Sequence, residues 1–344
     1  MTKGCYTALV TPFKNDAVDY KGLDRLVDFQ IENGVTGILS VGTTGESPTL
    51  TWEEHNKVIE NVAAKTKGRC LSIAGAGSNN TKEAIEATGH AAESGVDAVL
   101  LVDPYYNGPS SLEIRREYIE PVAKKFPDMQ IIPYVIPGRT GAQLLPEDLA
   151  ILYRDFHNVN TVKEATGNIK TMRRTRECCG PEYSIMSGDD GLLLQMMTDP
   201  DIKASGVISV LSNIVPGAIT ELVDLTCNSE IKKAEKLHLA LQPLFELVTV
   251  STIESTPFGE TLCRARNPLA VKTLMPVLGM PSGGCRKPLG KMTPKGVMKV
   301  LSIVRKVYEE TPAILHPLED FFEIKLAKRL FDSPNWEELC YDTY

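Results

Sequence analysis

The sequence predicts a (β/α)₈ barrel followed by a helical C-terminal region. Between Tyr6 and Val210, eight short apolar runs alternate with longer amphipathic stretches, which is the repeat that such a barrel requires. The runs are continuously apolar, as strands buried on both faces must be. The first run is followed by Thr11-Pro12-Phe13 and not by a Gly-rich phosphate loop. This absence disfavours the main alternative, an open doubly wound sheet.

Each predicted element of the barrel is short and bounded by turn residues. The expected strands are Tyr6–Val10, Gly37–Val41, Cys70–Ala74, Ala98–Val102, Gln130–Val135, Thr161–Lys163, Ser184–Met186 and Gly206–Val210. The expected helices are Lys21–Asn33, Thr51–Lys65, Thr81–Ser94, Ser111–Lys125, Pro146–Phe156, Ile169–Cys178 and Gly191–Thr198. We therefore assign residues 1–225 to a catalytic barrel.

Residues 226–344 are predicted to form a C-terminal helical region with an extended tail. From about Val215 the pattern contains helices only, at Ile219–Thr226, Ile231–Val250, Leu269–Leu278, Pro294–Glu310 and Leu318–Phe331. Apolar positions between Leu315 and Phe331 indicate one amphipathic helix in the tail. The sequence leaves four alternatives open for the tail, which are covering the barrel, joining a subunit contact, partly shielding a site, or packing without a further role.

Composition and charge narrow the class of protein. The 344 residues include 37 Lys and Arg against 44 Asp and Glu, a net charge of −7, which disfavours nucleic-acid binding. The N-terminus shows neither an export signal nor a membrane span, so we expect a cytoplasmic protein that does not bind membranes. The eight cysteines form no CxxC pair and show no metal-ligand spacing with the five histidines. We expect reduced thiols and no metal site.

The unusual polar residues follow the predicted strands, at the face of a barrel where active sites form. They are Gly42-Thr43-Thr44-Gly45-Glu46, Pro104-Tyr105-Tyr106-Asn107, Tyr134 with Pro137-Gly138-Arg139-Thr140-Gly141, Lys163-Glu164-Ala165-Thr166-Gly167-Asn168, Ser187-Gly188-Asp189-Asp190 and Gly206-Val207-Ile208-Ser209-Val210.

Lys163 is the clearest candidate among them. Burial of an ammonium in a strand lowers its pKa, and a neutral amine is the form that attacks a ketone. The alternative is a salt bridge with Glu164, but adjacent strand residues point to opposite faces. A nucleophilic role is favoured.

Hydroxyl and guanidinium groups on the same rim could assist this lysine. Tyr134, Tyr106 and Thr43 would each be ordinary in isolation, yet together they provide three hydroxyls for a proton relay. Arg139 suits bidentate binding of a carboxylate, although it could also be a surface arginine on a turn. Asp189 and Asp190 lack further metal ligands and are expected to cap the following helix.

Taken in order and spacing, these motifs resemble the dihydrodipicolinate synthase family, within the N-acetylneuraminate lyase superfamily. The resemblance runs from about Thr7 to Val210 and continues more weakly in Asn267-Pro268-Leu269-Ala270-Val271-Lys272. It implies a lyase of the class I aldolase type that condenses pyruvate with L-aspartate 4-semialdehyde in the diaminopimelate route to lysine. The resemblance also implies that the reaction requires no metal and no diffusible cofactor.

The resemblance also implies roles for single residues. Lys163 would form the imine with pyruvate, and Tyr134 would be the general acid and base in a relay with Thr43 and Tyr106. The family's counterpart of Tyr106 comes from the neighbouring subunit, so the resemblance implies a homo-oligomer and suggests a tetramer built as a dimer of dimers. The remaining substrate-binding residues would be Thr44 for the pyruvate carboxylate, Arg139 for the second substrate, and Gly188 and Ile208 through their backbone.

Two positions depart from the family pattern. Val135 and Gly138 stand where the family usually has Asn and Ser, and both departures are expected to reshape the second-substrate pocket. One alternative is therefore a pyruvate-dependent aldolase that acts on another aldehyde or sugar acid, although Arg139 and the tyrosine pair argue against it. A further alternative is a catalytically silent barrel used for binding, which the presence of Lys163 and Tyr134 opposes.

The resemblance extends to a regulatory site. Family members inhibited by L-lysine bind it at positions that match Ser47, Pro48, Trp52, His55, Asn79, Glu83 and Tyr105. Here Glu83 would pair with the lysine amine and Tyr105 would contact its carboxylate. An ordinary polar subunit interface is the alternative.

Overall fold

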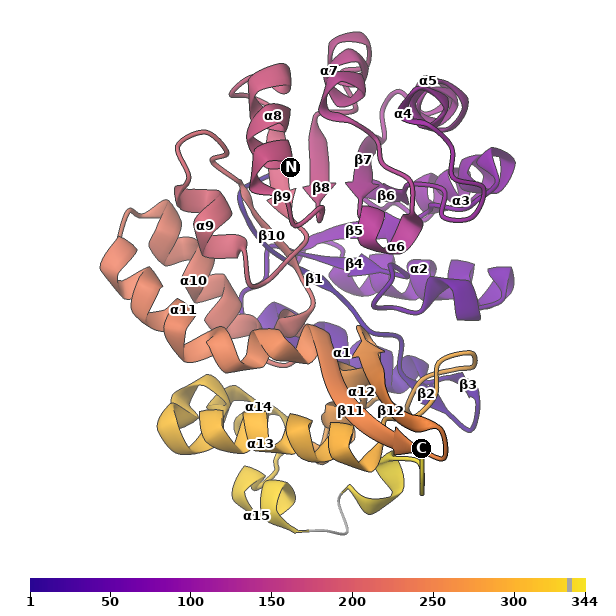
Figure 1. Cartoon of the computed structure of the whole chain (residues 1–344). Helices are drawn as coiled ribbons and strands as arrows, with labels where there is room; N and C mark the ends of the chain where they lie inside the picture. The colour runs from indigo at the N-terminus through magenta and orange to yellow at the C-terminus, as the bar shows by residue number, and fades with distance from the viewer. Residues whose placement is uncertain (333–335) are drawn as a thin grey trace.

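The computed structural model describes residues 1–332 and 336–344 and shows the predicted closed barrel. Its eight parallel strands follow one another around the barrel in chain order, and the last closes against the first (Figure 1). These strands are β1 (Gly4–Ala8), β4 (Gly37–Ser40), β5 (Leu71–Gly75), β6 (Ala98–Val102), β7 (Gln130–Val135), β8 (Thr161–Glu164), β9 (Ser184–Ser187) and β10 (Gly206–Ser209). Each predicted strand agrees with an observed one to within two residues at either end.

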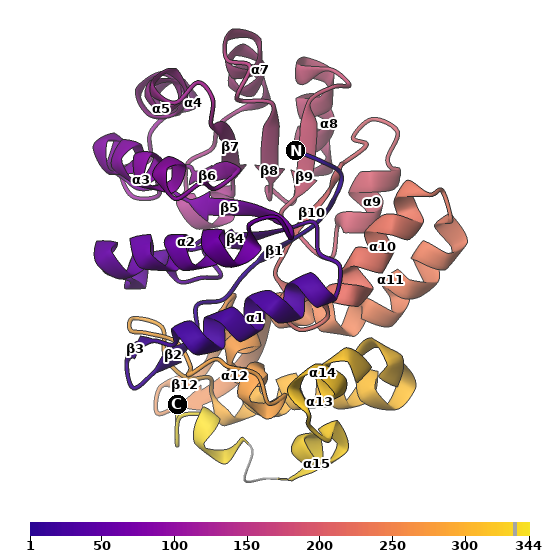
Figure 2. The same cartoon turned by 180° about the vertical axis from the view of Figure 1, so that it is seen from behind.

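Helices surround the barrel on its outside, as both views of the whole chain show (Figures 1 and 2). They are α1 (Tyr20–Glu32), α2 (Trp52–Thr66), α3 (Thr81–Glu93), α4 (Ser111–Glu113), the π-helix η2 (Ile114–Ile119), α5 (Glu120–Lys125), α6 (Pro137–Thr140), α7 (Pro146–Asp155), α8 (Ile169–Cys179), α9 (Leu193–Thr198), α10 (Pro216–Cys227) and α11 (Ile231–Phe245). Shorter elements are β2 (Phe13–Lys14), β3 (Ala17–Val18), η1 (Ser47–Thr49), η3 (Leu211–Asn213) and η4 (Glu246–Val248). No helix in the described ranges is long and apolar enough to cross a membrane.

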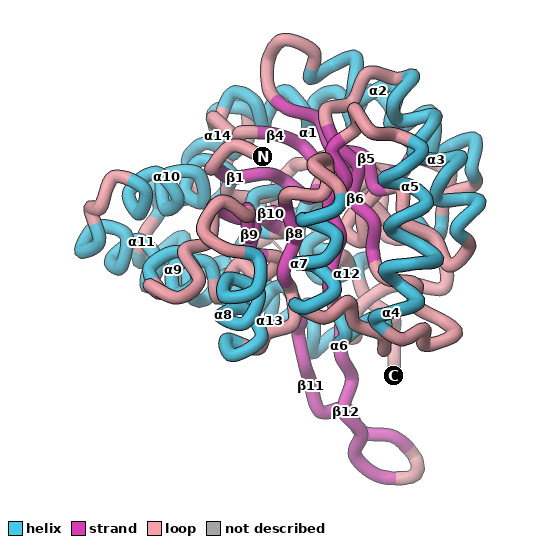
Figure 3. Tube along the Cα trace, turned by 90° about the horizontal axis from the view of Figure 1, so that it is seen from above, coloured by secondary structure: helices cyan, strands magenta, loops and turns pink. Residues whose placement is uncertain are grey.

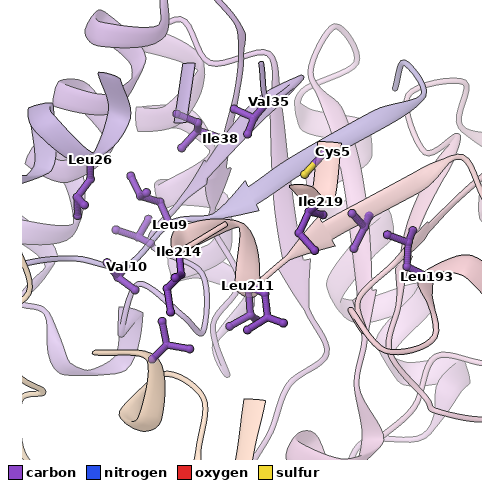
Figure 4. Close-up of a cluster of buried hydrophobic side chains, with 14 of the residues drawn as sticks. Cys5, Leu9, Val10, Leu26, Val35, Ile38, Leu193, Leu211, Ile214 and Ile219 are labelled. Atoms are coloured by element: carbon purple, nitrogen blue, oxygen red, sulfur yellow. The ribbon is translucent and has the colours of Figure 1, made fainter. Parts of the chain in front are cut away.

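The barrel has two apolar layers, because side chains of each strand point alternately inward and outward. The outward layer packs against the helices. Figure 4 shows part of it, where Cys5 and Leu9 meet Leu26 and Ile219. The inward layer fills the barrel itself and consists of Tyr6, Ala8, Leu39, Ile73, Ala98, Leu100, Ile132, Tyr134, Met186 and Ile208.

The C-terminal region differs from the prediction of helices only. Residues between α11 and the next helix form a long antiparallel hairpin of β11 (Thr249–Thr256) and β12 (Gly259–Arg266). Its β-branched first strand and the turn at Pro257-Phe258 are the sequence signal for it. Helix α12 (Leu269–Val277) and helix α13 (Pro294–Glu310) follow as expected.

The tail also differs, since the single expected helix is broken into two. Helix α14 (His316–Phe322) ends at Glu323, whose φ of 55° is left-handed, and helix α15 (Leu326–Phe331) follows it. The short helix η5 (Pro312–Ile314) precedes this pair, and η7 (Glu337–Leu339) follows it. The rings of Phe321 and Phe322 lie with their centroids 5.1 Å from that of Phe29 in α1. Arg329 donates hydrogen bonds to the carbonyls of Pro276 and Val277 at the end of α12. The tail therefore packs against α1 and α12.

Candidate active site

Lys163 lies inside the barrel, where the register of the strands directs it. Its Cα is paired with Tyr134 on β7 and with Met186 on β9, both of which belong to the inward layer. The side chain is 4% exposed, and its Nζ lies 4.1 Å from the centroid of the Tyr134 ring. Within the described part of the chain it forms no ion pair. Burial therefore acts on an ammonium that has no close counter-charge.

The electrostatic surroundings favour the neutral amine of Lys163. Burial lowers its pKa to about 7, the negative charge of Asp190 opposes this, and the positive charge of Arg139 adds to it. A substantial fraction of Lys163 is therefore unprotonated near neutral pH. This is the state that a nucleophilic amine needs.

Glu164 does not pair with Lys163, in agreement with the strand argument. Its Oε1 accepts a hydrogen bond of 2.7 Å from the Thr166 amide, and burial raises the pKa of its carboxyl. The two side chains leave the strand on opposite faces. The alternative of a structural salt bridge is thus wrong for this lysine.

Tyr134 and Thr43 are brought together beside the lysine. Burial raises the pKa of Tyr134 to about 12, although the positive charge of Arg139 and a hydrogen bond with Thr43 act in the opposite direction and lower it. Both residues line a cavity of about 180 Å³ at the mouth of the barrel. The other lining residues are Val41, Gly42, Ser47, Pro48, Gly75, Gly77, Leu100, Val102, Tyr105, Ile136, Arg139 and Thr140. A phenol that keeps its proton at neutral pH can donate to a carbonyl or an alkoxide here.

Thr44 is held in place by a residue that the sequence analysis did not single out as part of the site. The buried Thr44 hydroxyl accepts a hydrogen bond of 3.0 Å from Nδ2 of Asn267. Because its oxygen is the acceptor, the Thr44 proton is free to be donated to a ligand. Asn267 lies directly after β12, so the C-terminal region contributes to the barrel mouth. The only sequence signal for it was its place in the weaker C-terminal motif.

Arg139 sits on the short helix α6 at the same mouth. Its Nη2 donates to the backbone carbonyl of Asn267 at 3.0 Å, so Asn267 contacts both carboxylate-binding candidates. The other guanidinium N–H groups of Arg139 have no protein acceptor in the described residues. They remain able to bind a carboxylate.

The two departures from the family pattern have different surroundings. Val135 belongs to the outward layer and faces the helices, so it does not line the cavity. This corrects the expectation that it reshapes the pocket. Gly138 lies on α6, and a Cβ added there would meet nothing within 4 Å. Packing therefore does not demand glycine at that position.

Gly188 lies beside the lysine, and Ile208 belongs to the inward layer of the barrel. A Cβ at Gly188 would stand 2.8 Å from the Cβ of Ala165 and 3.2 Å from Cε of Lys163. A larger residue would therefore crowd the lysine. Ile208 is fully buried in the inward layer.

Tyr106 is not brought into the site by its own chain. Its side chain is 86% exposed, whereas its neighbour Tyr105 lines the cavity. Of the three predicted hydroxyls, a single subunit thus assembles Tyr134 and Thr43 only.

Asp189 and Asp190 do not cap the next helix. The buried carboxylate of Asp190 accepts hydrogen bonds from the Ser209 hydroxyl and from the amides of Val210 and Leu211, so it ties β9 to the end of β10. Asp189 accepts from the amide of Gly191 in its own turn. No group of three His, Cys, Asp or Glu side chains that could hold a metal is present in the described ranges.

Part of the predicted lysine site borders the same cavity. Ser47, Pro48 and Tyr105 line it directly. The Asn79 side chain accepts a hydrogen bond of 2.6 Å from the Tyr105 amide, and Glu83 accepts one from the Ser78 hydroxyl.

The two remaining residues of the predicted lysine site, Trp52 and His55, form an aromatic pair at the start of α2. The rings of Trp52 and His55 meet edge to face with centroids 5.1 Å apart. Burial lowers the pKa of His55 to about 4, so this imidazole is neutral near pH 7.

Comparison with known proteins gives one consistent result. The sequence model described as the Dihydrodipicolinate synthetase family matches residues 1–307. A 4-hydroxy-tetrahydrodipicolinate synthase of Geotalea uraniireducens is 42% identical over 306 residues, which is 89% of this chain and 99% of the relative.

Solved structures agree with the sequence comparisons. The 4-hydroxy-tetrahydrodipicolinate synthase of the methanotroph Methylacidiphilum fumariolicum matches with a TM-score of 0.83 and 35% identity, over 92% of this chain and 99% of that one. The enzyme of Cyanidioschyzon merolae, solved with lysine bound, matches with a TM-score of 0.80 and 34% identity, over 89% and 98%.

Proposed function

The chain belongs to the dihydrodipicolinate synthetase family of class I aldolase-type lyases, and we propose that its Lys163 joins pyruvate to L-aspartate 4-semialdehyde through an imine. The enzyme has the 4-hydroxy-tetrahydrodipicolinate synthase activity of its relatives, a step in diaminopimelate and lysine biosynthesis. The observation that carries the role of Lys163 is a buried lysine without a counter-charge, whose pKa of about 7 makes it a nucleophile at neutral pH.

The first half of the reaction activates pyruvate. The neutral Lys163 amine attacks the ketone carbon, and loss of one water gives the imine. The protonated imine withdraws electrons, so a proton leaves the pyruvate methyl group and an enamine forms. Thr44 holds the pyruvate carboxylate with its free hydroxyl proton, while Tyr134 and Thr43 move protons to and from the reacting oxygen.

The second half forms the carbon–carbon bond and frees the lysine. The enamine carbon attacks the aldehyde carbon, and the resulting alkoxide takes a proton from the relay. The substrate amine then attacks the imine carbon, closes the ring and displaces the Lys163 amine. Arg139 holds the carboxylate of the aldehyde substrate, while Gly188 leaves room beside Lys163.

A complete relay needs a second subunit. The exposure of Tyr106 supports its insertion into the site of a neighbour in a homotetramer. Mixing a Tyr106→Phe variant with a Lys163→Met variant tests this, because hybrid sites that combine an intact lysine with an intact partner tyrosine should regain activity. If mixed subunits stay as inactive as the separate variants, Tyr106 does not act across an interface.

Feedback inhibition by L-lysine is a second functional proposal. A relative solved with lysine bound is 34% identical to this chain, and Ser47, Pro48 and Tyr105 of the proposed lysine site line the cavity. L-lysine at millimolar concentration should lower turnover, and Glu83→Gln should weaken that effect by removing the charge that pairs with the ligand amine. An enzyme that ignores lysine at such concentrations would refute the proposal.

Turnover with a labelled substrate tests the proposed reaction. The enzyme with ¹³C-pyruvate and L-aspartate 4-semialdehyde should yield one labelled cyclic dicarboxylate by NMR. Consumption of pyruvate with a sugar-acid aldehyde in preference to the semialdehyde would favour the other aldolase activity. No consumption with any aldehyde would favour a silent barrel.

A further inference from the structure

The β11–β12 hairpin stands at the mouth of the barrel beside α6 and projects clear of the body of the molecule (Figure 3). Two reciprocal contacts join its base to α6. Arg266 donates from Nη1 to the carbonyl of Gly138 at 3.3 Å, and Arg139 donates from Nη2 to the carbonyl of Asn267 at 3.0 Å. Each guanidinium is therefore bonded to the residue adjacent to the other arginine, which brings the two cations together.

These cations have no counter-charge. Neither Arg139 nor Arg266 forms an ion pair with a carboxylate in residues 1–332 or 336–344, in contrast to Arg115, Arg173 and Arg286, which all do. Burial lowers the pKa of the Arg139 guanidinium, and the positive charge of Arg266 lowers it further. Holding two like charges together without an anion is unfavourable because they repel each other, and a bound anion would offset this repulsion.

Arg264 continues the positive charge along the hairpin. It lies two residues from Arg266 on the same strand, and therefore on the same face of the hairpin. The side chain is exposed and forms no ion pair in the described part of the chain. It stands farther from the cavity than Arg266, because β12 runs toward its base at Asn267.

We propose that Arg266 is a second carboxylate-binding residue of the active site, which together with Arg139 holds the carboxylate of the acceptor aldehyde. With Nη1 of Arg266 and Nη2 of Arg139 bound to backbone carbonyls, the remaining N–H groups of both are available to one anion between them. The substrate class is thus an aldehyde that bears a carboxylate at its far end. This inference rests on the proposed function, because the cavity must be the aldehyde site.

The test compares two four-carbon aldehydes that differ in the carboxylate. Succinic semialdehyde and butanal are titrated calorimetrically into the full-length protein, both untreated and after pyruvate has been fixed with borohydride. Arg266→Gln should weaken binding of succinic semialdehyde about tenfold, as expected for loss of a charged hydrogen bond, and leave butanal unchanged. Arg264→Gln should have a smaller effect of the same kind.

Lys295→Gln is the matched control, because Lys295 donates to the carbonyl of Ile253 and is also a cation against the hairpin. It should change neither titration. Equal weakening of both aldehydes by Arg266→Gln would show a role in shaping α6 only and overturn the proposal. No change in Arg266→Gln, or the same loss in Lys295→Gln, would also overturn it.

The titration does not depend on turnover. Loss of carboxylate binding in Arg266→Gln, together with no consumption of L-aspartate 4-semialdehyde by the unaltered enzyme, would contradict the proposed function. The carboxylate-binding role of Arg266 would then stand, and only its assignment to the acceptor aldehyde would fall. Normal turnover of the unaltered enzyme, with no effect of Arg266→Gln on the titrations, would overturn the role of Arg266 and leave the proposed function standing.

Discussion

Two buried lysines show how the same side chain serves different ends in two regions of the molecule. Lys163 lies inside the barrel and Lys272 lies on α12, and both have Nζ close to an aromatic ring, at 4.1 Å from the centroid of Tyr134 and 4.2 Å from that of Phe13. Lys272 is fully buried but forms an ion pair with Glu46 and donates to the carbonyl of Thr11. Lys163 has neither kind of partner in the described residues.

The difference lies in the neighbouring carboxylate. Burial lowers the pKa of both amines, but the adjacent Glu46 opposes this at Lys272, whereas Lys163 has only the charge of Asp190, whose oxygens are engaged with β10. Lys272 thereby joins α12 to the loop that carries Thr43 and Thr44, and serves the structure. Lys163 is left free to react.

The largest expected effect is on turnover when the unpaired lysine is replaced. Lys163→Met should lower kcat by about 10⁴-fold or more, because no other group can form the imine. Its melting temperature should not fall, since an unpaired buried amine is exchanged for an apolar side chain of similar length. Steady-state kinetics and thermal unfolding measure both, and residual turnover near that of the unaltered enzyme would place the nucleophile elsewhere.

The matched change at the paired lysine should act on stability. Lys272→Met leaves the Glu46 carboxylate buried without its partner, which should lower the free energy of unfolding by about 3–5 kcal/mol. The double variant Glu46→Gln/Lys272→Met should recover much of this loss in chemical denaturation. A single variant as stable as the parent would show that the pair does not hold α12.

Replacement of Tyr134 should separate proton transfer from imine formation. Tyr134→Phe keeps the ring beside Lys163 but removes the phenolic proton, so kcat should fall about 10²–10⁴-fold. Pyruvate should still be trapped on Lys163 by borohydride. A variant with normal kcat would remove Tyr134 from the relay, while one that traps no pyruvate would give it a role in binding.

The smallest effect is the pH dependence of pyruvate trapping. The reactive form of Lys163 is neutral, and its lowered pKa of about 7 places half of the amine in that form at neutral pH. The trapping rate with cyanoborohydride should rise about tenfold per unit below pH 7 and level off above about pH 8. A rate that keeps rising toward pH 10 would indicate an ordinary exposed lysine.

Much of the barrel and its site could be predicted from the sequence, because both depend on local patterns. Continuous apolar runs locate strands, and residues just after them must meet at one face, which is how Lys163, Tyr134 and Thr43 were grouped. The opposite faces of Lys163 and Glu164 followed from strand geometry alone.

The remaining features depend on contacts between distant segments. The Thr44 to Asn267 hydrogen bond and the Lys272 to Glu46 pair join residues more than 220 positions apart, which no local pattern reveals. The helix-cap prediction for Asp190 is wrong for a milder form of the same reason, because its carboxylate bonds to residues about 20 positions further along the chain, beyond the reach of a local capping pattern. The β11–β12 hairpin does have a local sequence signal in its β-branched first strand and its turn. The helical patterns on both sides of it nevertheless favoured a prediction of helices throughout this region.

Imine formation between Lys163 and pyruvate can be measured as a change in intact mass after treatment with pyruvate and borohydride. We expect a gain equal to one pyruvate, less one water and plus two hydrogens. Peptide mapping should place this adduct on Lys163, and it should be absent from Lys163→Met. Lys272→Met should retain the adduct. A folded protein that gains no mass, or an adduct on another lysine, would show that Lys163 is not the imine-forming residue.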